Sequence, residues 1–353
     1  MDNLVDEVIE IGEKKVGKEH PTFIIAEAGV NHNGKLGLAK ELVDEAKKAG
    51  VDAVKFQTFK AEDLVTKEGK MADYQKKNLG EEKSQYEMIK ERELGYDEFE
   101  ELKRYCDEKG ILFLSTPHTE EAADFLEELV PVFKIGSGDL TNLPFLEKIA
   151  KKGKPMILST GMGTLGEVEE AVGKIKGTGN EDLILLHCVT DYPASIEDIN
   201  LNTMLTLSGC FKTLVGYSDH TLGITVPLAA VSLGATVIEK HFTLDKKMKG
   251  PDHKASLEPE ELKEMVHEIR SLESALGDGI KRPTQNEEEI KKVARKSIVA
   301  GEDIPQGSVL KEDMLDIKRP GFGIKPKHLE RLIGRGVKRD IKEDELITWD
   351  MIK

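Results

Sequence analysis

The sequence has few cysteines, few aromatic residues and no long apolar run. Its three cysteines, Cys106, Cys188 and Cys210, lie far apart without CxxC spacing, which excludes a disulfide framework and a structural zinc site. The most apolar stretch, residues 226–238, is too short to cross a bilayer and is interrupted by Pro227. The first residues lack the basic and apolar regions of a signal peptide. We therefore expect a cytoplasmic protein with no membrane partner.

Positive charge is also in short supply. Lys and Arg number 51 against 66 Asp and Glu, which gives a formal net charge of −15. Because phosphate contacts dominate protein affinity for nucleic acids, a chain this acidic is a poor general nucleic-acid binder, and we expect no such partner. Any anion that the protein handles must be bound in a local basic pocket.

Short β-branched runs alternate with longer amphipathic segments along most of the chain. Eight β/α units over about 250 residues predict a closed (β/α)8 TIM barrel, since a doubly wound sheet usually has fewer strands. The strands are predicted at 23–26, 53–56, 111–114, 132–135, 156–158, 183–186, 213–215 and 236–238. The helices are predicted at 38–49, 99–109, 120–129, 144–151, 165–175, 201–207, 224–233 and 259–276.

Several segments lie outside this repeat. Residues 8–16, within an N-terminal extension of residues 1–20, are predicted to form a hairpin under the barrel, which spans 21–280. A polar insert, Lys60–Glu93, follows the second strand and is long enough to be a functional lid. A charged connector, 281–294, precedes a small β-rich domain at 295–353 with strand-like segments at 297–300 and 315–318.

Polar residues follow each predicted strand, and in a barrel the strand ends meet at one rim where function gathers. Two lysines within apolar strands, Lys55 and Lys134, predict an anion cradle rather than solvated surface charges. The hydroxyls of this cradle are those of Thr116, Ser137, Ser159 and Ser218. A single histidine here is more often a hydrogen-bonded structural residue. His220 and His241, however, end neighbouring strands, which favours a divalent-metal pair with open positions.

One nucleotide-binding pattern is rejected. Residues 161–166 fit the GxGxxG spacing between a strand and a helix, but no acidic residue ends the next strand. The glycines are better explained by close approach of backbone and hydroxyls at the barrel rim.

The strings at the strand ends resemble the sialic acid synthase family over residues from about 20 to 353. They include Ile25–Gly34, Val54–Thr58, Phe133–Asp139, Leu158–Met162, Gly216–Thr221, Ile238–Asp245 and Gly250–Pro259. The tail around Ile317–Gly321 looks like the antifreeze-like (SAF, β-clip) domain of these enzymes. Asp139 and Thr190 stand where some relatives have Glu and Asn.

The resemblance implies condensation of phosphoenolpyruvate with N-acetylmannosamine and water, giving N-acetylneuraminate and phosphate by C–O cleavage. It implies catalytic roles for Glu27, Lys55, Lys134 and Asp139, and a divalent metal, usually Mn²⁺ with Mg²⁺ or Co²⁺ possible, on His220 and His241. Phosphoenolpyruvate would contact Lys55, Thr116, Lys134, Ser137, Ser159, Thr190 and Ser218. The sugar would contact Asp139, Tyr192, Asp252 and Arg319, the last reaching from a second subunit of a swapped homodimer.

Three alternatives stay open. A legionaminic or pseudaminic acid synthase would use a diacetamido hexose instead. A metal-independent pyruvate aldolase would form a Schiff base on Lys134 or Lys55, which borohydride would trap. A third reading treats the small C-terminal domain as a binding module on an inert barrel.

Overall fold

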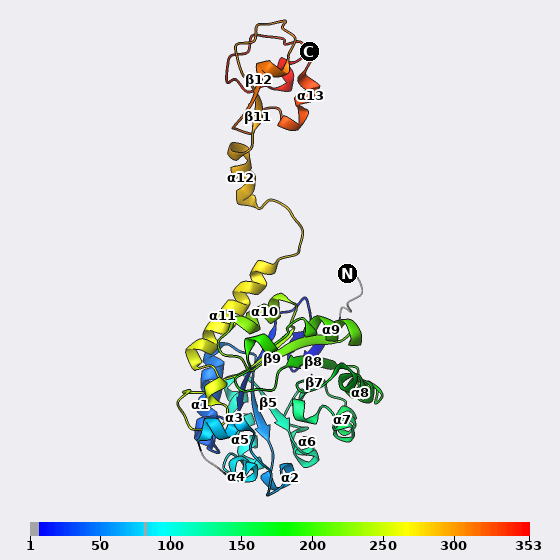
Figure 1. Cartoon of the computed structure of the whole chain (residues 1–353), viewed down its shortest axis with the longest axis vertical. Coiled ribbons are helices and arrows are strands. Elements are labelled where there is room, and N and C mark those ends of the chain that lie inside the picture. Colours follow the sequence, from blue (N-terminus) through cyan, green and yellow to red (C-terminus); the bar gives the residue numbers. More distant parts are fainter. Residues whose placement is uncertain (1–6, 81–82) are drawn as a thin grey trace. The chain divides into compact units, whose positions relative to one another are not determined.

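Eight parallel strands form one sheet in the part of the chain that this computed structural model describes, residues 7–80 and 83–353, with the Lys77 side chain left aside. Their order is β5-β4-β3-β10-β9-β8-β7-β6, and β5 lies beside β6, so the barrel is nearly closed. The predicted (β/α)8 fold is thereby confirmed (Figure 1). The strands are β3 (Phe23–Gly29), β4 (Ala53–Thr58), β5 (Leu112–Pro117), β6 (Phe133–Ile135), β7 (Met156–Ser159), β8 (Leu183–Cys188), β9 (Leu214–Asp219) and β10 (Val237–His241).

Amphipathic helices cover the outside of the barrel. The first of them buries Ala39, Leu42, Val43 and Ala46, the spacing of one helical face, and ends at Gly50 in the left-handed conformation. The last begins with Pro259 in its first turn and has the predicted bounds. The barrel helices are α1 (Leu36–Ala49), α5 (Tyr96–Lys109), α6 (Glu120–Leu126), α7 (Leu143–Ala150), α8 (Leu165–Lys176), α9 (Thr203–Phe211), α10 (Thr225–Ser232) and α11 (Pro259–Leu276).

The lower part of the barrel interior is filled with apolar side chains. Alternate strand residues such as Ile25, Leu114 and Ile184 pack together there. A hairpin of β1 (Ile9–Ile11) and β2 (Lys14–Val16) adds Ile9, Ile11 and Val16 to the same cluster. The hairpin closes the end where the strands begin, so the polar side chains of the interior gather at the opposite end.

The insert after β4 is not the continuous loop that the sequence predicts. It contains α2 (Ala61–Leu64), α3 (Asp73–Leu79) and α4 (Gln85–Lys90), around a small core of Met71, Leu79 and Met88. At the start of α4, the Ser84 hydroxyl accepts from the Glu87 backbone N–H, and the Glu87 carboxylate accepts from the Ser84 N–H. This reciprocal cap stabilises a helix that is too short to be recognised from hydrophobic periodicity alone.

The chain divides into two compact units, Met1–Gly277 and Asp278–Lys353. The second contains α12 (Gln285–Ala294), β11 (Ser297–Ala300), β12 (Leu315–Lys318) and α13 (Leu329–Leu332), and β11 pairs antiparallel with β12. The expected charged connector thus holds a helix, which the cap between Thr284 and Glu287 signals in the sequence. Single 3-10 turns in both units are Ser137–Asp139, Ile196–Asp198, His253–Ala255, Glu312–Met314, Pro326–His328 and Trp349–Met351.

Among the described residues, no helix combines the length and the apolarity needed to cross a bilayer.

A fully buried ion pair joins β9 to β10 on the side facing away from the barrel interior. Lys240 Nζ lies 2.5 Å from Asp219 Oδ2 and also donates to the Thr221 carbonyl. The Thr221 N–H and hydroxyl each donate to the Asp219 carboxylate at 3.0 Å. Asp219 and Lys240 are neighbours in the strand register. The pair therefore fixes the alignment of the two strands that carry His220 and His241.

We predict that Lys240→Met destabilises the protein by about 3–5 kcal/mol, because it leaves the Asp219 charge buried without its partner. Urea unfolding followed by circular dichroism measures this loss. The control Lys151→Met removes an exposed i,i+4 pair with Glu147 and should leave the unfolding free energy nearly unchanged. Equal small losses for the two variants would show that the buried pair does not hold β9 against β10.

Candidate active site

A cavity of about 360 Å³ opens at the C-terminal ends of the barrel strands, below the insert. It brings together most of the site residues that the sequence predicts. Two predicted residues are not in its lining. Asp139 lies in a 3-10 turn, where its carboxylate accepts from Asn142 Nδ2 at 3.1 Å, and Arg319 is exposed in the second unit. The predicted residues that line the cavity are Glu27, Lys55, Thr116, Lys134, Ser137, Ser159, Thr190, Tyr192, Ser218, His220, His241 and Asp252.

Lys55 is buried in this cavity and points at two carboxylates. Its Nζ lies 2.6 Å from Glu27 Oε2 and 3.6 Å from Glu239 Oε2, and it donates to Thr116 Oγ1 at 3.1 Å. The second Glu27 oxygen accepts from Gln57 Nε2 at 3.0 Å. The Glu27 and Lys55 side chains meet because these residues are paired in the register of strands β3 and β4.

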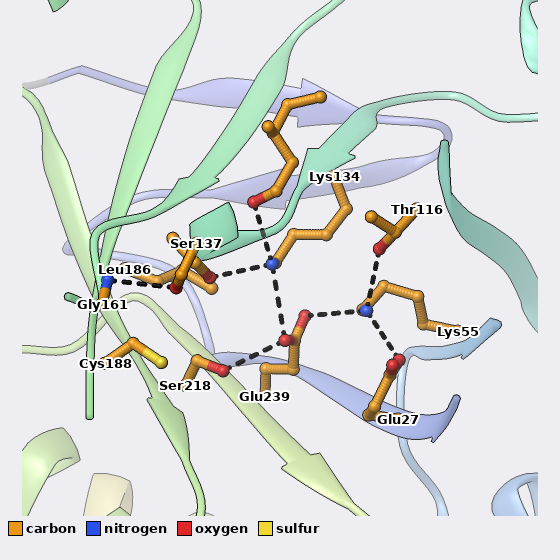
Figure 2. A network of polar contacts seen from close by, with 12 residues as sticks. Glu27, Lys55, Thr116, Lys134, Ser137, Gly161, Leu186, Cys188, Ser218 and Glu239 are labelled. Atoms are coloured by element: carbon orange, nitrogen blue, oxygen red, sulfur yellow. Dashed lines mark hydrogen bonds and ion pairs between the residues drawn. The ribbon is translucent and has the colours of Figure 1, made fainter. Parts of the chain in front are cut away.

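Lys134 reaches the same centre from the other side (Figure 2). Its Nζ lies 3.5 Å from Glu239 Oε1 and donates to Ser159 Oγ at 2.8 Å. Ser218 also donates its hydroxyl to Glu239 Oε1 at 3.1 Å. The Glu239 carboxylate has Lys134 near one oxygen and Lys55 near the other.

The sequence analysis did not assign a role to Glu239. The signal that identifies it is its place two residues before His241 in the last strand, since strand residues i and i+2 share a face. Any side chain sharing the inward face with His241 has to meet the lysines from the facing strands.

The two carboxylates have opposite electrostatic environments. Burial disfavours ionisation of Glu239, but Lys134 and Lys55 outweigh it and hold the pKa of Glu239 below its ordinary value. Burial raises the pKa of Glu27, and Lys55 only partly offsets this because the nearby Glu239 charge adds to it. Glu239 is therefore the fixed negative charge, and Glu27 is the carboxylate closer to taking up a proton.

The lysines also differ. Burial lowers the pKa of Lys134 more than Glu239 restores it, whereas Glu239 and Glu27 together raise the pKa of Lys55 despite its burial. With all four groups ionised, the charges of two lysines and two glutamates cancel. An anion entering the cavity must therefore attract the ammonium groups away from carboxylates that already neutralise them.

The hydroxyl side of the cavity depends on one glycine. The Gly161 N–H donates to Ser137 Oγ at 3.0 Å. A Cβ at Gly161 would stand 2.2 Å from Thr190 Oγ1 and 2.7 Å from Ser137 Oγ, closer than atoms can approach. The first glycine of the rejected GxGxxG pattern thus makes room for two predicted ligand hydroxyls.

His220 and His241 lie together at the cavity, with ring centroids 5.3 Å apart and the Tyr192 ring against both. His220 Nδ1 donates to the Val189 carbonyl at 2.6 Å, which leaves the lone pair on Nε2. His241 Nδ1 is buried and has no hydrogen-bond partner among the residues that the structure describes. Burial, with the charges of His220 and Lys55, holds the pKa of His241 well below its ordinary value, so this ring is neutral.

These two imidazoles fit a divalent cation that takes its remaining ligands from water or substrate. Among the described residues, no cluster of three or more His, Cys, Asp or Glu side chains is arranged as a complete metal site. The histidine pair thus offers an open site rather than a closed structural one.

The far side of the cavity is formed by the insert, which contributes both apolar and polar side chains. Tyr74 stacks on Tyr192 at 5.1 Å between ring centroids. Asp252 lies in the same region, where burial raises its pKa to about 6. The other insert side chains that line this wall are Leu64, Val65, Gln75, Gln85, Met88, Ile89 and Arg92.

Comparison with known proteins gives consistent matches over nearly the whole chain. The NeuB family profile matches residues 42–281 and the SAF domain profile matches residues 295–353. N,N'-diacetyllegionaminic acid synthase of Campylobacter jejuni is 50% identical over 92% of this chain and 98% of its own length. Human N-acetylneuraminate-9-phosphate synthase is 40% identical over 96% of this chain and 94% of its own length. The crystal structure of N-acetylneuraminic acid synthetase from Leptospira borgpetersenii, in complex with citrate, superposes with a TM-score of 0.72 at 38% identity, covering 81% of this chain and 95% of that one.

We predict that Gly161→Ala weakens anion binding, because the new methyl group displaces the Ser137 and Thr190 hydroxyls. Its overpacking also costs about 1–3 kcal/mol. Inorganic phosphate should raise the melting temperature of this variant less than that of the parent. Gly166→Ala is the matched control, since its Cβ meets open space within the same segment. Equal protection of both variants by phosphate would contradict the assignment of Ser137 and Thr190 to an anion site.

Proposed function

The chain belongs to the NeuB family, and from this premise we propose that it is an N,N'-diacetyllegionaminic acid synthase. It would condense phosphoenolpyruvate with a diacetamido hexose and water, releasing phosphate. At the level of the family it is a phosphoenolpyruvate-dependent sugar acid synthase. The observation that carries the proposal is that one cavity, walled on one side by the insert, holds the lysine pair Lys55 and Lys134 together with the histidine pair His220 and His241.

The lysine end of the cavity suits phosphoenolpyruvate. Lys55 and Lys134 supply two ammonium groups, and hydroxyls surround them. A trianionic substrate has more negative charge than Glu27 and Glu239 together, so it competes for the lysines. We assign phosphoenolpyruvate to Lys55, Thr116, Lys134, Ser137, Ser159, Thr190 and Ser218.

The proton chemistry falls to Glu27. C3 of phosphoenolpyruvate attacks the aldehyde carbon of the open-chain sugar, and water then adds to the oxocarbenium carbon C2. The C2–O bond to phosphate breaks as the new hydroxyl on C2 becomes the keto group and loses its proton. Glu27, whose pKa burial raises, takes a proton from the attacking water, which passes to the alkoxide left on the sugar carbon, and then takes the proton of the C2 hydroxyl. Glu239 keeps both lysines in place throughout.

His220 and His241 would hold a divalent metal, for which Mn²⁺ is the first choice and Mg²⁺ or Co²⁺ are alternatives. When bound, such an ion polarises the sugar aldehyde as a Lewis acid. The chain's own contribution is to present two imidazoles, of which His241 is held neutral, and to place Tyr192 against both rings.

Two arguments favour a diacetamido hexose over the N-acetylmannosamine that we first expected. The Campylobacter legionaminic acid synthase shares 50% of its residues with this chain, against 40% for the human N-acetylneuraminate-9-phosphate synthase. A second acetamido group replaces a hydroxyl by a methyl-bearing amide. The insert offers Val65, Met88 and Ile89 to such a methyl, and Gln75 and Gln85 to the amide.

We also propose that Arg319 completes the acceptor site from the SAF domain of a second subunit, as a swapped homodimer. Arg319 is exposed, and the exposed side chains Ile317 and Phe322 flank it in the sequence. A small unit that presents an arginine among apolar side chains suits docking on another surface.

With phosphoenolpyruvate and Mn²⁺, we predict phosphate release about 10–100-fold faster with a 2,4-diacetamido hexose than with N-acetylmannosamine, the discrimination that one small group gives in an apolar pocket. EDTA should abolish release. A steady-state phosphate assay across acceptor sugars, each with and without EDTA, tests this. Faster release with N-acetylmannosamine would favour the sialic acid reading. Pyruvate-dependent inactivation by borohydride, with no metal requirement, would favour the aldolase.

We predict that Arg319→Ala raises the KM for the acceptor by about tenfold or more while the KM for phosphoenolpyruvate changes little. The reason is that the change removes a charged hydrogen-bond donor from the sugar end alone. Arg331→Ala, another exposed arginine of the same unit, is the control. Unchanged kinetics in Arg319→Ala would support a separate binding role for the SAF domain.

A further inference from the structure

One imidazole in the cavity has no task in the scheme above. His118 comes immediately after β5 and lines the cavity two residues beyond Thr116. Its backbone N–H donates to the Thr58 carbonyl at 3.2 Å, which ties it to the end of β4. His118 is thus positioned by the same two strands that carry Thr116 and Lys55.

Two neighbours fix the side of the cavity on which the ring lies. The edge of Phe59 packs against it, with ring centroids 6.1 Å apart. Gly136 lies close to the ring: a Cβ atom added to this glycine would be 4.0 Å from His118 Cε1 and 3.8 Å from Thr116 Cγ2. Gly136 precedes Ser137, so the ring lies beside the turn that carries a phosphoenolpyruvate hydroxyl. His118 is therefore at the lysine end of the cavity and not at the sugar end.

The His118 ring nitrogens have no hydrogen-bond partner among the described residues. Within residues 7–80 and 83–353, no side-chain hydrogen bond or ion pair involves the His118 imidazole, and the side chain is only partly exposed, toward the cavity. The side chain is half-buried, and its ring nitrogens are not among the fully buried polar atoms that lack a partner. Here a bound ligand would supply the missing partner.

The charges that act most strongly on His118 are those of Lys55 and Lys134. Burial lowers the pKa of His118 to about 4, and Lys55 of β4 and Lys134 of β6 add to this effect. Glu27 of β3 and Glu239 of β10 lie behind these lysines, paired with them. On the α6 side, Glu121 is paired with Lys60. The imidazole is neutral in the empty cavity because of its burial first and the two lysine charges second, and an anion on those lysines offsets the second cause.

We propose that His118 is a catalytic residue that donates a proton to the phosphate group as it leaves C2. In this step the C2–O bond to phosphate breaks and its electron pair goes to the phosphate oxygen, which takes the proton from the imidazolium. The C2 hydroxyl becomes the keto group and its proton goes to Glu27. His118 ends neutral, Glu27 ends protonated, and both return to their starting states through solvent. This inference rests on the proposed function of the same cavity.

The arrangement also explains how His118 obtains its proton. A phosphoenolpyruvate bound on Lys55 and Lys134 places its negative charge between those lysines and the ring. The imidazole then faces an anion instead of two cations, which raises its affinity for a proton. Substrate binding itself therefore converts the neutral ring of the empty cavity into the acid that the last step needs.

The test compares the pH dependence of kcat in the parent, His118→Phe and His118→Gln, measured with saturating phosphoenolpyruvate, Mn²⁺ and the best acceptor. Phe keeps the packing against Phe59, and Gln keeps a hydrogen-bond donor, but neither carries a titratable proton. We expect kcat to fall by about 10²–10⁴-fold in both, with a much smaller change in the KM for phosphoenolpyruvate. In the parent kcat should fall as pH rises, because the acid must be protonated, and this alkaline fall should be absent in both variants.

His267→Gln, which changes an exposed histidine on α11, is the matched control and should behave like the parent. A raised KM for phosphoenolpyruvate with unchanged kcat and an unchanged pH profile would overturn the proposal, since His118 would then only bind substrate. Unchanged kinetics would also overturn it. If His118→Phe does not fold, His118→Gln decides the question. Absence of phosphate release in the parent with every acceptor would count against the proposed function itself, and is distinguishable from a failure of the His118 variants alone.

Discussion

Two ammonium groups are buried at the mouth of the barrel, and the structure around them depends on how they are neutralised. A buried charge without a partner costs several kcal/mol, so Lys55 and Lys134 require carboxylates at close range. Glu239 serves both, one oxygen to each, and Glu27 serves Lys55 a second time. The charges of these two lysines and two glutamates cancel. A more highly charged anion can enter by displacing the carboxylates from the lysines. The network also gives the two carboxylates different pKa shifts. In the proposed reaction Glu239 would stay ionised and Glu27 would accept protons.

The strands that carry this network are held from both of their faces. On β9 and β10 the inward residues are Ser218, His220, Glu239 and His241, and the outward ones between them are Asp219 and Lys240, which form the buried pair. The period of two in a strand thus places a structural ion pair directly behind the functional side chains. Below the site, the N-terminal hairpin and the apolar interior fill the barrel, and the cavity lies at the opposite end beside the insert.

Much of the fold could be predicted from the sequence. Eight β-branched runs with amphipathic helices between them specify a barrel, and the strand-end rule then brings Lys55, Lys134, His220 and His241 to one rim. The features that hydrophobic periodicity does not reveal depend on tertiary contacts or on short capping motifs. The insert helices are too short for a periodic signal and α12 buries none of its residues, so these helices are marked in the sequence by caps such as those at Ser84 and Thr284. The sequence places Glu239 on the same strand face as His241, but its ion pairs become evident only when the facing lysines are placed. Asp139 illustrates the opposite case, since it follows a rim strand but its turn directs it outside the cavity lining.

The central claim is that this network binds phosphoenolpyruvate and promotes cleavage of its C–O bond. The most direct measurement uses phosphoenolpyruvate labelled with oxygen-18 in the oxygen that bridges C2 and phosphorus, with the best acceptor and Mn²⁺. Mass spectrometry then determines the isotopic composition of the inorganic phosphate released. The account predicts that the label leaves with the phosphate, because water supplies the keto oxygen at C2. Unlabelled phosphate would mean that the P–O bond breaks instead, which would contradict the mechanism assigned to this cavity.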